Sequence, residues 1–228
     1  EKDTQSHHEV DIWGLSTVVA DEGADAAAWF SEYLGADVFV GRALGPRHTK
    51  ETAALAPHIP DASCDINLQD CAPLHLCTEE AVEYLQRELK DPSINVFRFR
   101  PNIVVRGAPF PTEERWQTFQ LVRPSSQSND EGKQQEQQPL QLKTVKLMDR
   151  CSMPTITDNG ERNAKFLPTA FLKKTHAVAE HGSGPCPMFG LAVFPEVDAE
   201  AFTTHKIALG DVVEVKTLTP PRTYETAA

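Results

Sequence analysis

The chain has 228 residues, of which 40% are hydrophobic and 24% charged, and its formal net charge is −11. This length and composition predict a folded protein that can bury a core, organised as one large domain or two small ones. The acidic balance argues against a general nucleic-acid-binding protein, which needs a basic surface. No apolar run approaches the ~18 residues of a membrane-spanning helix. The chain opens at Glu1 without a visible signal peptide, so we expect a fragment or a processed form.

Five cysteines are present, and an odd number in a chain of this length favours a reducing compartment over a disulfide framework. They are Cys64, Cys71, Cys77, Cys151 and Cys186. None belongs to a C-x-x-C pair, which argues against a structural zinc site. The eight histidines show no H-x-x-x-H pattern, which argues against a metal site built from histidines.

The first half of the chain alternates between strand and helix patterns. Strands are predicted at 9–16, 37–43, 73–77 and 99–107. Helices are predicted at 20–35 and 78–89 from their apolar spacing. Asp21 and Thr78 are the expected N-caps, and Gly35 suits the position just after the first helix.

A polar segment, 124–139, contains no hydrophobic residue. It cannot bury enough surface to offset the entropy lost on ordering, so we expect a disordered insertion. Its flanks, "WQTFQLV" and "LQLKTVKLM", are predicted strands that pair across it as a long hairpin. Such an insertion costs little, because loop-closure entropy grows slowly with length.

The second half of the chain is dominated by strand patterns. A helix with proline in its first turn is predicted at 167–179, and strands at 187–197 and 205–218, the last of which begins with a Gly-Asp turn. The order of elements is not a regular βαβ alternation. It predicts a mainly β, α+β fold in which a β-barrel carries packed helices.

The segment "LMDRCSMPTITDNGER" (147–162) places Cys151 directly after Arg150, at the end of an apolar run. A neighbouring positive charge favours the thiolate over the thiol. A thiolate is a soft metal ligand and a nucleophile. The alternative is an inert cysteine buried at a strand end.

Five blocks in order carry a family resemblance: "FRPNIVV", a tryptophan in "TEERW", "LMDRCSMPTITDNGER", "PMFGLAVF" and "IALGDVVEV". Together they resemble a MOSC domain, and the pattern is most similar to the mitochondrial amidoxime-reducing component family with its fungal and bacterial relatives. The resemblance implies a MOSC-type β-barrel at 64–220, preceded by a partial β/α N-terminal subdomain at 1–63.

The resemblance also implies a molybdenum–molybdopterin cofactor. Cys151 stands at the family position that supplies the metal ligand and is the expected catalytic residue. The expected cofactor-binding residues are Asp70, Cys71, Arg100, Asn102, Asp149, Arg150 and Ala192, the last through its main chain only. Arginine offers a fork for phosphate, and asparagine offers a donor and an acceptor.

By the same resemblance, the protein is expected to be an oxidoreductase that reduces N-hydroxylated or N-oxide substrates. A b5-type cytochrome and its reductase are the expected electron donors, and neither nucleic acid nor a membrane span in this chain is expected. The expected location is intracellular, at the mitochondrial outer membrane or in the cytoplasm, with the targeting segment absent from this chain.

The chain departs from the family pattern in two places. Thr157 stands where relatives have aspartate, and the Lys-Ser pair that helps to bind the cofactor phosphate is missing from the start. Alternatives therefore stay open: a cofactor carrier, the C-terminal module of a cofactor sulfurase whose upstream domain binds pyridoxal phosphate, or a truncated homologue that binds nothing. A cysteine hydrolase that pairs Cys151 with His176 is a further alternative.

Deleting residues 124–139 and joining the strands by a short turn should leave the melting temperature nearly unchanged. The reason is that the segment has no apolar anchor. Thermal unfolding followed by circular dichroism measures this. A drop of more than a few degrees would show that the segment packs on the domain.

Overall fold

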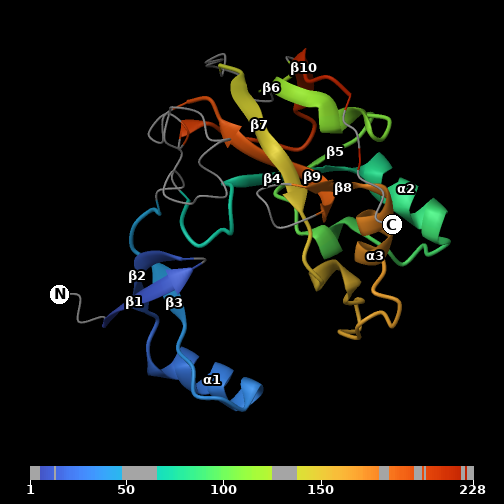
Figure 1. The fold of residues 1–228 in the computed structure, drawn as a ribbon. Coiled ribbons are helices and arrows are strands. Elements are labelled where there is room, and N and C mark those ends of the chain that lie inside the picture. The colour runs from blue at the N-terminus through green and yellow to red at the C-terminus, as the bar shows by residue number, and fades with distance from the viewer. Residues whose placement is uncertain are drawn as a thin grey trace. The chain divides into compact units, whose positions relative to one another are not determined.

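The computed structural model describes residues 6–12, 14–47, 66–124, 138–179, 185–197, 202, 204–221 and 224 (Figure 1). The chain forms two compact units, Glu1–Pro73 and Leu74–Ala228. The predicted boundary between residues 63 and 64 falls in 48–65, outside the described residues.

The first unit contains a three-stranded antiparallel sheet with the order β1-β2-β3. Its strands are β1 (His7–Ile12), β2 (Leu15–Asp21) and β3 (Gly41–Ala43). The single strand predicted at 9–16 is wrong: the chain reverses there between β1 and β2, with Gly14 at a φ of 83°. A positive φ is readily adopted by glycine, so Gly14 marks the turn that the alternating pattern concealed.

Helix α1 (Ala24–Leu34) follows β2 and precedes β3 along the chain. Its predicted N-cap was wrong: Asp21 ends β2, the helix begins after Gly23, and no side chain caps it. The carboxylate of Asp21 instead accepts a hydrogen bond from the Gly23 amide at 2.8 Å. The predicted end is confirmed, because Gly35 adopts the left-handed conformation at a φ of 65°. None of the helical residues is buried.

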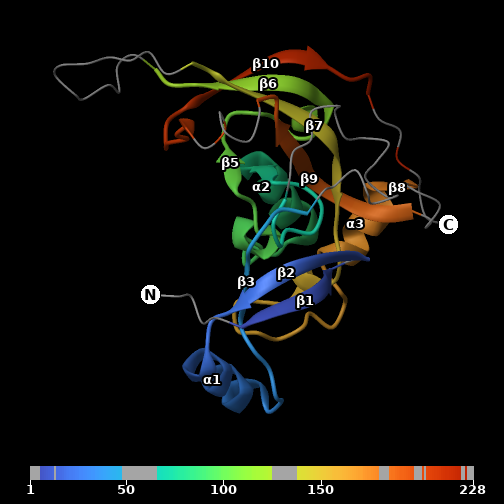
Figure 2. The ribbon, with the colours of Figure 1, turned by 90° about the vertical axis from the view of Figure 1, so that its left-hand side faces the viewer.

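The second unit is built on a seven-stranded sheet, in which the main path runs β10-β6-β7-β9-β4-β5 and β8 pairs with β9. The strands are β4 (Leu74–Thr78), β5 (Ile103–Val105), β6 (Trp116–Val122), β7 (Leu140–Asp149), β8 (Ala177–Ala179), β9 (Pro185–Pro195) and β10 (Val212–Leu218). Only the β4–β5 pair is parallel among these described strands. Figure 2 shows β6, β7 and β10 bending together into a curled sheet. The predicted α+β fold is confirmed.

The hairpin predicted across the polar insertion is also confirmed. Strands β6 and β7 pair antiparallel, with Leu121 opposite Leu140 at the end nearest the insertion. Residues 125–137 of the insertion lie outside the described part of the chain.

Helix α2 (Glu79–Leu89) follows β4 and begins as predicted, because the Thr78 hydroxyl accepts the Ala81 amide hydrogen at 3.1 Å. The predicted strand at 99–107 shrinks to β5, since the chain before it forms the short 3₁₀ helix η2 (Val96–Phe99). The predicted helix at 167–179 also shrinks. It forms α3 (Thr169–Thr175), and the residues after it form β8. Two further 3₁₀ turns are η3 (Thr112–Arg115) and η5 (Met153–Thr155).

Two hydrophobic clusters lie on opposite faces of β4 and β9. Alternate residues of a strand point to opposite faces. Leu76 and Met188 accordingly join one cluster, which is lined by β6 and β7, whereas Cys77 and Phe189 join the other. The second cluster holds the buried face of α2 and Leu172 of α3. These helices therefore cover one side of the central strands.

Gly190 lies in β9 beside three residues of β4 that leave no space for a side chain. It has a φ of 82°, and a Cβ built there would lie 2.4 Å from His75 Nε2, 2.8 Å from the Leu76 carbonyl oxygen and 2.9 Å from Cys77 Sγ. Such distances leave no room for any side chain.

Gly190→Ala should therefore destabilise the protein by about 3 kcal/mol or more, because overpacking adds to backbone strain. Gly160→Ala is the matched control: its φ is 79°, but nothing lies within 4 Å of the added Cβ. It should cost only the strain, about 1 kcal/mol. Urea unfolding measures both. Equal losses would show that the close approach at Gly190 is not limiting.

Glu113 is a buried carboxyl group beside the start of α2. One oxygen accepts a hydrogen bond from the Thr78 hydroxyl at 3.2 Å, whereas Oε2 is buried without a hydrogen-bond partner. Burial raises the pKa of Glu113 from 4.5 to about 7, despite the opposing hydrogen bond from Thr78, and nearby Glu80 raises it further. The neutral acid is therefore the form that the folded state favours.

Because the pKa of Glu113 is raised in the folded state, its contribution to the free energy of unfolding depends on pH. The contribution is fully present below pH 4.5, and it is lost as the pH rises through 7. Glu113→Gln stays neutral, so it should be more stable than the parent at pH 8, by up to about 3 kcal/mol, and nearly equal at pH 4.5. Urea unfolding at the two pH values measures this, with exposed Glu83→Gln as the control. No gain at pH 8 would contradict the burial of an ionising carboxyl group.

Candidate functional site

The predicted ligand, Cys151, lies two residues beyond the end of β7 and is exposed. Its sulfur accepts a hydrogen bond from the Met153 amide at 3.4 Å, and its carbonyl oxygen accepts one from the Thr169 hydroxyl at 3.2 Å. The alternative of a buried, inert cysteine at a strand end is therefore wrong. Among the four cysteines that the structure describes, none forms a disulfide.

Arg150 holds the chain directly before Cys151. Its amide donates to the Pro187 carbonyl oxygen in β9 at 2.8 Å, and Nη2 donates to the Phe99 carbonyl oxygen at 2.9 Å. The guanidinium carbon also lies 5.7 Å from the centroid of the Phe99 ring, a cation–π distance. One arginine thus connects the end of β7 to both β9 and η2.

Asp149, the residue before Arg150, forms an ion pair with Lys146 on the same strand at 2.6 Å. Burial acts to raise the pKa of Asp149, but the hydrogen bond and charge of Lys146, helped by Arg150, outweigh it. The pKa therefore lies below its usual value. Asp149 remains ionised at neutral pH.

Arg100 and Asn102 follow η2 on the way into β5. Arg100 has a φ of 55° and an exposed side chain, and its main-chain amide donates to the Phe97 carbonyl oxygen at 3.1 Å. Asn102 makes two hydrogen bonds to the main chain of His75. Its side-chain oxygen accepts the His75 amide hydrogen at 2.8 Å, and its amide donates to the His75 carbonyl oxygen at 2.8 Å. This oxygen is thus committed to the fold, and the NH₂ group of Asn102 is the part that can face a ligand.

His75 is the residue of this site that the sequence reasoning missed. It is buried on β4, opposite Ala192 of β9, and its Nε2 lies 3.4 Å from Cys77 Sγ. Burial, together with the positive charge of Arg150, lowers the pKa of His75 to about 4, against hydrogen bonds with the backbone of Arg100, Phe189 and Phe99. The only available signal was a polar residue inside the apolar run "LHLC".

Cys77 completes this buried pair as a neutral thiol. Burial raises its pKa to about 12, against the charge of Arg150. A neutral imidazole beside a neutral thiol makes a structural hydrogen bond and not a reactive ion pair. The pair therefore has a structural role in the core of the candidate site.

The structure thus brings Arg100, Asn102, Arg150 and Ala192 together around His75 and Phe99, with Cys151 next in the chain. Ala192 is fully buried within β9, opposite His75 and Lys146 in the neighbouring strands. Asp70 and Cys71 belong to the first unit, where Asp70 is exposed and Cys71 half-buried.

The hydrolase alternative gains no support from His176. Its Nδ1 lies 2.8 Å from the Thr175 hydroxyl, and its ring packs against the rings of Tyr84, Phe110 and Tyr224. Burial lowers the pKa of His176. The imidazole is therefore part of an aromatic cluster, while the sulfur of Cys151 contacts the Met153 amide.

A family model described as "MOSC domain" matches residues 64–214. The chain belongs to the MOSC domain family. This confirms the resemblance seen in the sequence and associates the chain with a family linked to the molybdenum cofactor.

Curated relatives are named mitochondrial amidoxime reducing components. Component 2 of Bos taurus is 31% identical over 153 residues, which cover 65% of this chain and 39% of that protein. Component 2 of Rattus norvegicus is 27% identical over 113 residues (48% and 32%), and component 1 of Danio rerio is 31% identical over 115 residues (48% and 34%). The chain thus spans between 32% and 39% of the length of these relatives.

The donor set at Cys151 fits the cofactor that the family implies. An exposed sulfur is a soft ligand, and it suits a metal that arrives with its other ligands on a dithiolene. Arg100 carries an exposed guanidinium group that can bind a phosphate through two N–H donors. Among the described residues, no group of three or more His, Cys, Asp or Glu side chains is placed to hold a metal ion.

Proposed function

We propose that this MOSC domain binds a molybdenum–molybdopterin cofactor and belongs to an oxidoreductase that reduces N-hydroxylated or N-oxide substrates. The observation that carries the proposal is the exposed thiol of Cys151, held beside an arginine that is anchored to the core. The names of the relatives support the reaction class. Cofactor, activity and substrate are all parts of this proposal.

When bound, the cofactor supplies the redox chemistry that takes oxygen from an N-oxygenated substrate. Cys151 contributes the sulfur ligand, which its exposure makes available. Arg100 binds the anionic phosphate of the cofactor, and the NH₂ group of Asn102 donates to its pterin. Arg150 fixes the approach of Cys151 through its bonds to Phe99 and Pro187.

Electrons must come from a separate donor, because reduction of N–OH to N–H consumes electrons and protons and releases water. A small redox protein, such as a b5-type cytochrome with its reductase, supplies them in this proposal. The relatives are named mitochondrial, which supports a mitochondrial location. None of the helices in the described part of the chain has the length and apolar character to cross a bilayer.

Cys151→Ser tests the proposal on protein made in a host that synthesises the cofactor. N-reduction should fall by about a hundredfold or more, and the visible spectrum should change, because a hydroxyl is a harder ligand and matches the metal poorly. Stability should change little, since the residue is exposed.

Cys186→Ser, at a half-buried cysteine of β9, is the matched control and should keep both properties. Unchanged activity and spectrum in Cys151→Ser would contradict the assignment of the ligand. Parent protein that retains cofactor without reducing any N-oxygenated compound would favour a cofactor carrier or a sulfurase module.

A further inference from the structure

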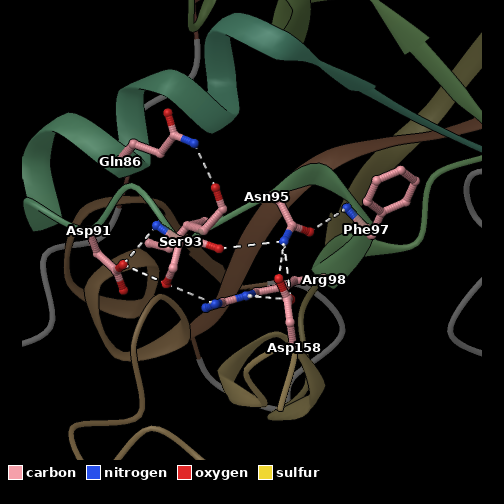
Figure 3. Close-up of polar contacts among 8 residues, drawn as sticks. Gln86, Asp91, Ser93, Asn95, Phe97, Arg98 and Asp158 are labelled. Atoms are coloured by element: carbon pink, nitrogen blue, oxygen red, sulfur yellow. Dashed lines mark hydrogen bonds and ion pairs between the residues drawn. The ribbon is translucent and has the colours of Figure 1, made fainter. Parts of the chain in front are cut away.

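Asp158 lies in the loop after Cys151 and contacts two side chains that come from the segment after α2 (Figure 3). Asn95 Nδ2 donates to both carboxylate oxygens of Asp158, at 3.1 and 2.9 Å, and Arg98 Nε lies 3.8 Å from Oδ1. We name these three residues the Asp158 clamp. Asn95 and Asp158 are 63 positions apart in the sequence, so the clamp joins two distant loops.

Arg98 is a buried cation at the centre of this contact. Its side chain is 3% exposed, whereas that of Asp158 is 66% exposed. A buried charge is strongly unfavourable unless opposite charges face it. Besides Asp158, Arg98 Nη2 donates to the Ser93 hydroxyl at 3.1 Å, and that hydroxyl donates to Asp91 at 2.6 Å. Hydrogen bonds from Ser93, helped by the charge of Arg98, lower the pKa of Asp91.

On the α2 side, the clamp rests on an ordered segment. Asn95 caps η2, because its side-chain oxygen accepts the Phe97 amide hydrogen at 3.1 Å. Gln86 of α2 donates to the Ile94 carbonyl oxygen at 2.7 Å (Figure 3). The charge-assisted hydrogen bonds from this fixed asparagine, together with the ion pair to Arg98, constrain the position of Asp158.

On the Cys151 side, the loop has its own backbone bonds. The Thr157 amide donates to the Glu161 carbonyl oxygen at 2.8 Å, and the Gly160 amide donates to the Thr157 carbonyl oxygen at 2.9 Å. The Asn163 amide donates to the Thr155 carbonyl oxygen at 2.8 Å. Contacts that fix Asp158 therefore also restrict the motion of the turn around it.

Cys151 lies between two residues that both contact the segment 95–99. Arg150, directly before it, donates a hydrogen bond to Phe99 at the end of η2. Asp158, after it, accepts hydrogen bonds from Asn95, the N-cap of η2, and forms an ion pair with Arg98 within η2. We propose that the Asp158 clamp is a positioning device that fixes the Cys151 loop against η2. Only its consequence for the cofactor rests on the proposed function.

Amide hydrogen exchange on the full chain tests the clamp without any cofactor. Asp158→Ala should speed exchange of the loop amides of Met153, Thr157, Gly160 and Asn163 by about tenfold or more, because it removes two hydrogen bonds and an ion pair. Asp158→Asn keeps an acceptor for Asn95 and should have an intermediate effect, about threefold. Exchange in β9 should stay unchanged in both variants.

Two matched controls come from the same turn. Glu161→Gln removes one negative charge at an exposed side chain, and Asn159→Ala removes an exposed polar group. Both should leave the exchange of the loop amides at the parental rate. In the double variant Asn95→Ser, Asp158→Ala, exchange should be no faster than in Asp158→Ala, because serine can still cap η2 and the two changes break the same contact.

Parental exchange in Asp158→Ala would overturn the clamp, as would equal acceleration in Glu161→Gln or acceleration that extends to β9. For the cofactor-loaded protein, Asp158→Ala should shift the visible absorption while Glu161→Gln should not. A loosened loop with an unchanged spectrum would overturn the positioning role. Failure of the parent protein to bind cofactor would count against the proposed function. The clamp would then be tested by the hydrogen-exchange rates alone.

Discussion

The close approach of β9 to β4 at Gly190 is the constraint on which the candidate site depends. Because Gly190 has no side chain, the His75 ring and the Cys77 sulfur occupy the space beside it. Burial and the charge of Arg150 keep His75 neutral, so this polar pair stays within the core without ionising. Asn102 then binds the backbone of His75 from both directions, which places the Arg100 segment on a rigid strand.

Much of the second unit was predictable, because its strands and helices carry strong hydrophobic patterns. The hairpin around the polar insertion, the cap of α2 at Thr78 and the apolar strand β9 all follow from local sequence. The failures were segments whose state depends on distant partners. Residues 177–179 continue a helical pattern, but they pair with β9 and form β8. The strand predicted at 99–107 is shorter, because Phe99 ends the 3₁₀ helix η2 and only Ile103–Val105 pair with β4.

The same distinction applies to the site. Arg150 and Cys151 could be found because the charged residue and the thiol are adjacent in a recognisable block. His75 lies inside an apolar run that correctly predicts a strand, but the pattern did not show that its imidazole would be buried beside the site. Asp158 was not among the expected site residues, because its contacts with Asn95 and Arg98 join positions 63 and 60 residues apart, and no local pattern encodes such a contact.

The central claim is that the sulfur of Cys151 is the protein's ligand to molybdenum, held in place by Arg150 on one side and Asp158 on the other. X-ray absorption at the molybdenum edge of the cofactor-loaded protein tests it most directly, because it counts the sulfur atoms bound to the metal. The account predicts one sulfur fewer in Cys151→Ser than in the parent, and no difference between Cys186→Ser and the parent. An equal sulfur count in the parent and in Cys151→Ser would contradict it.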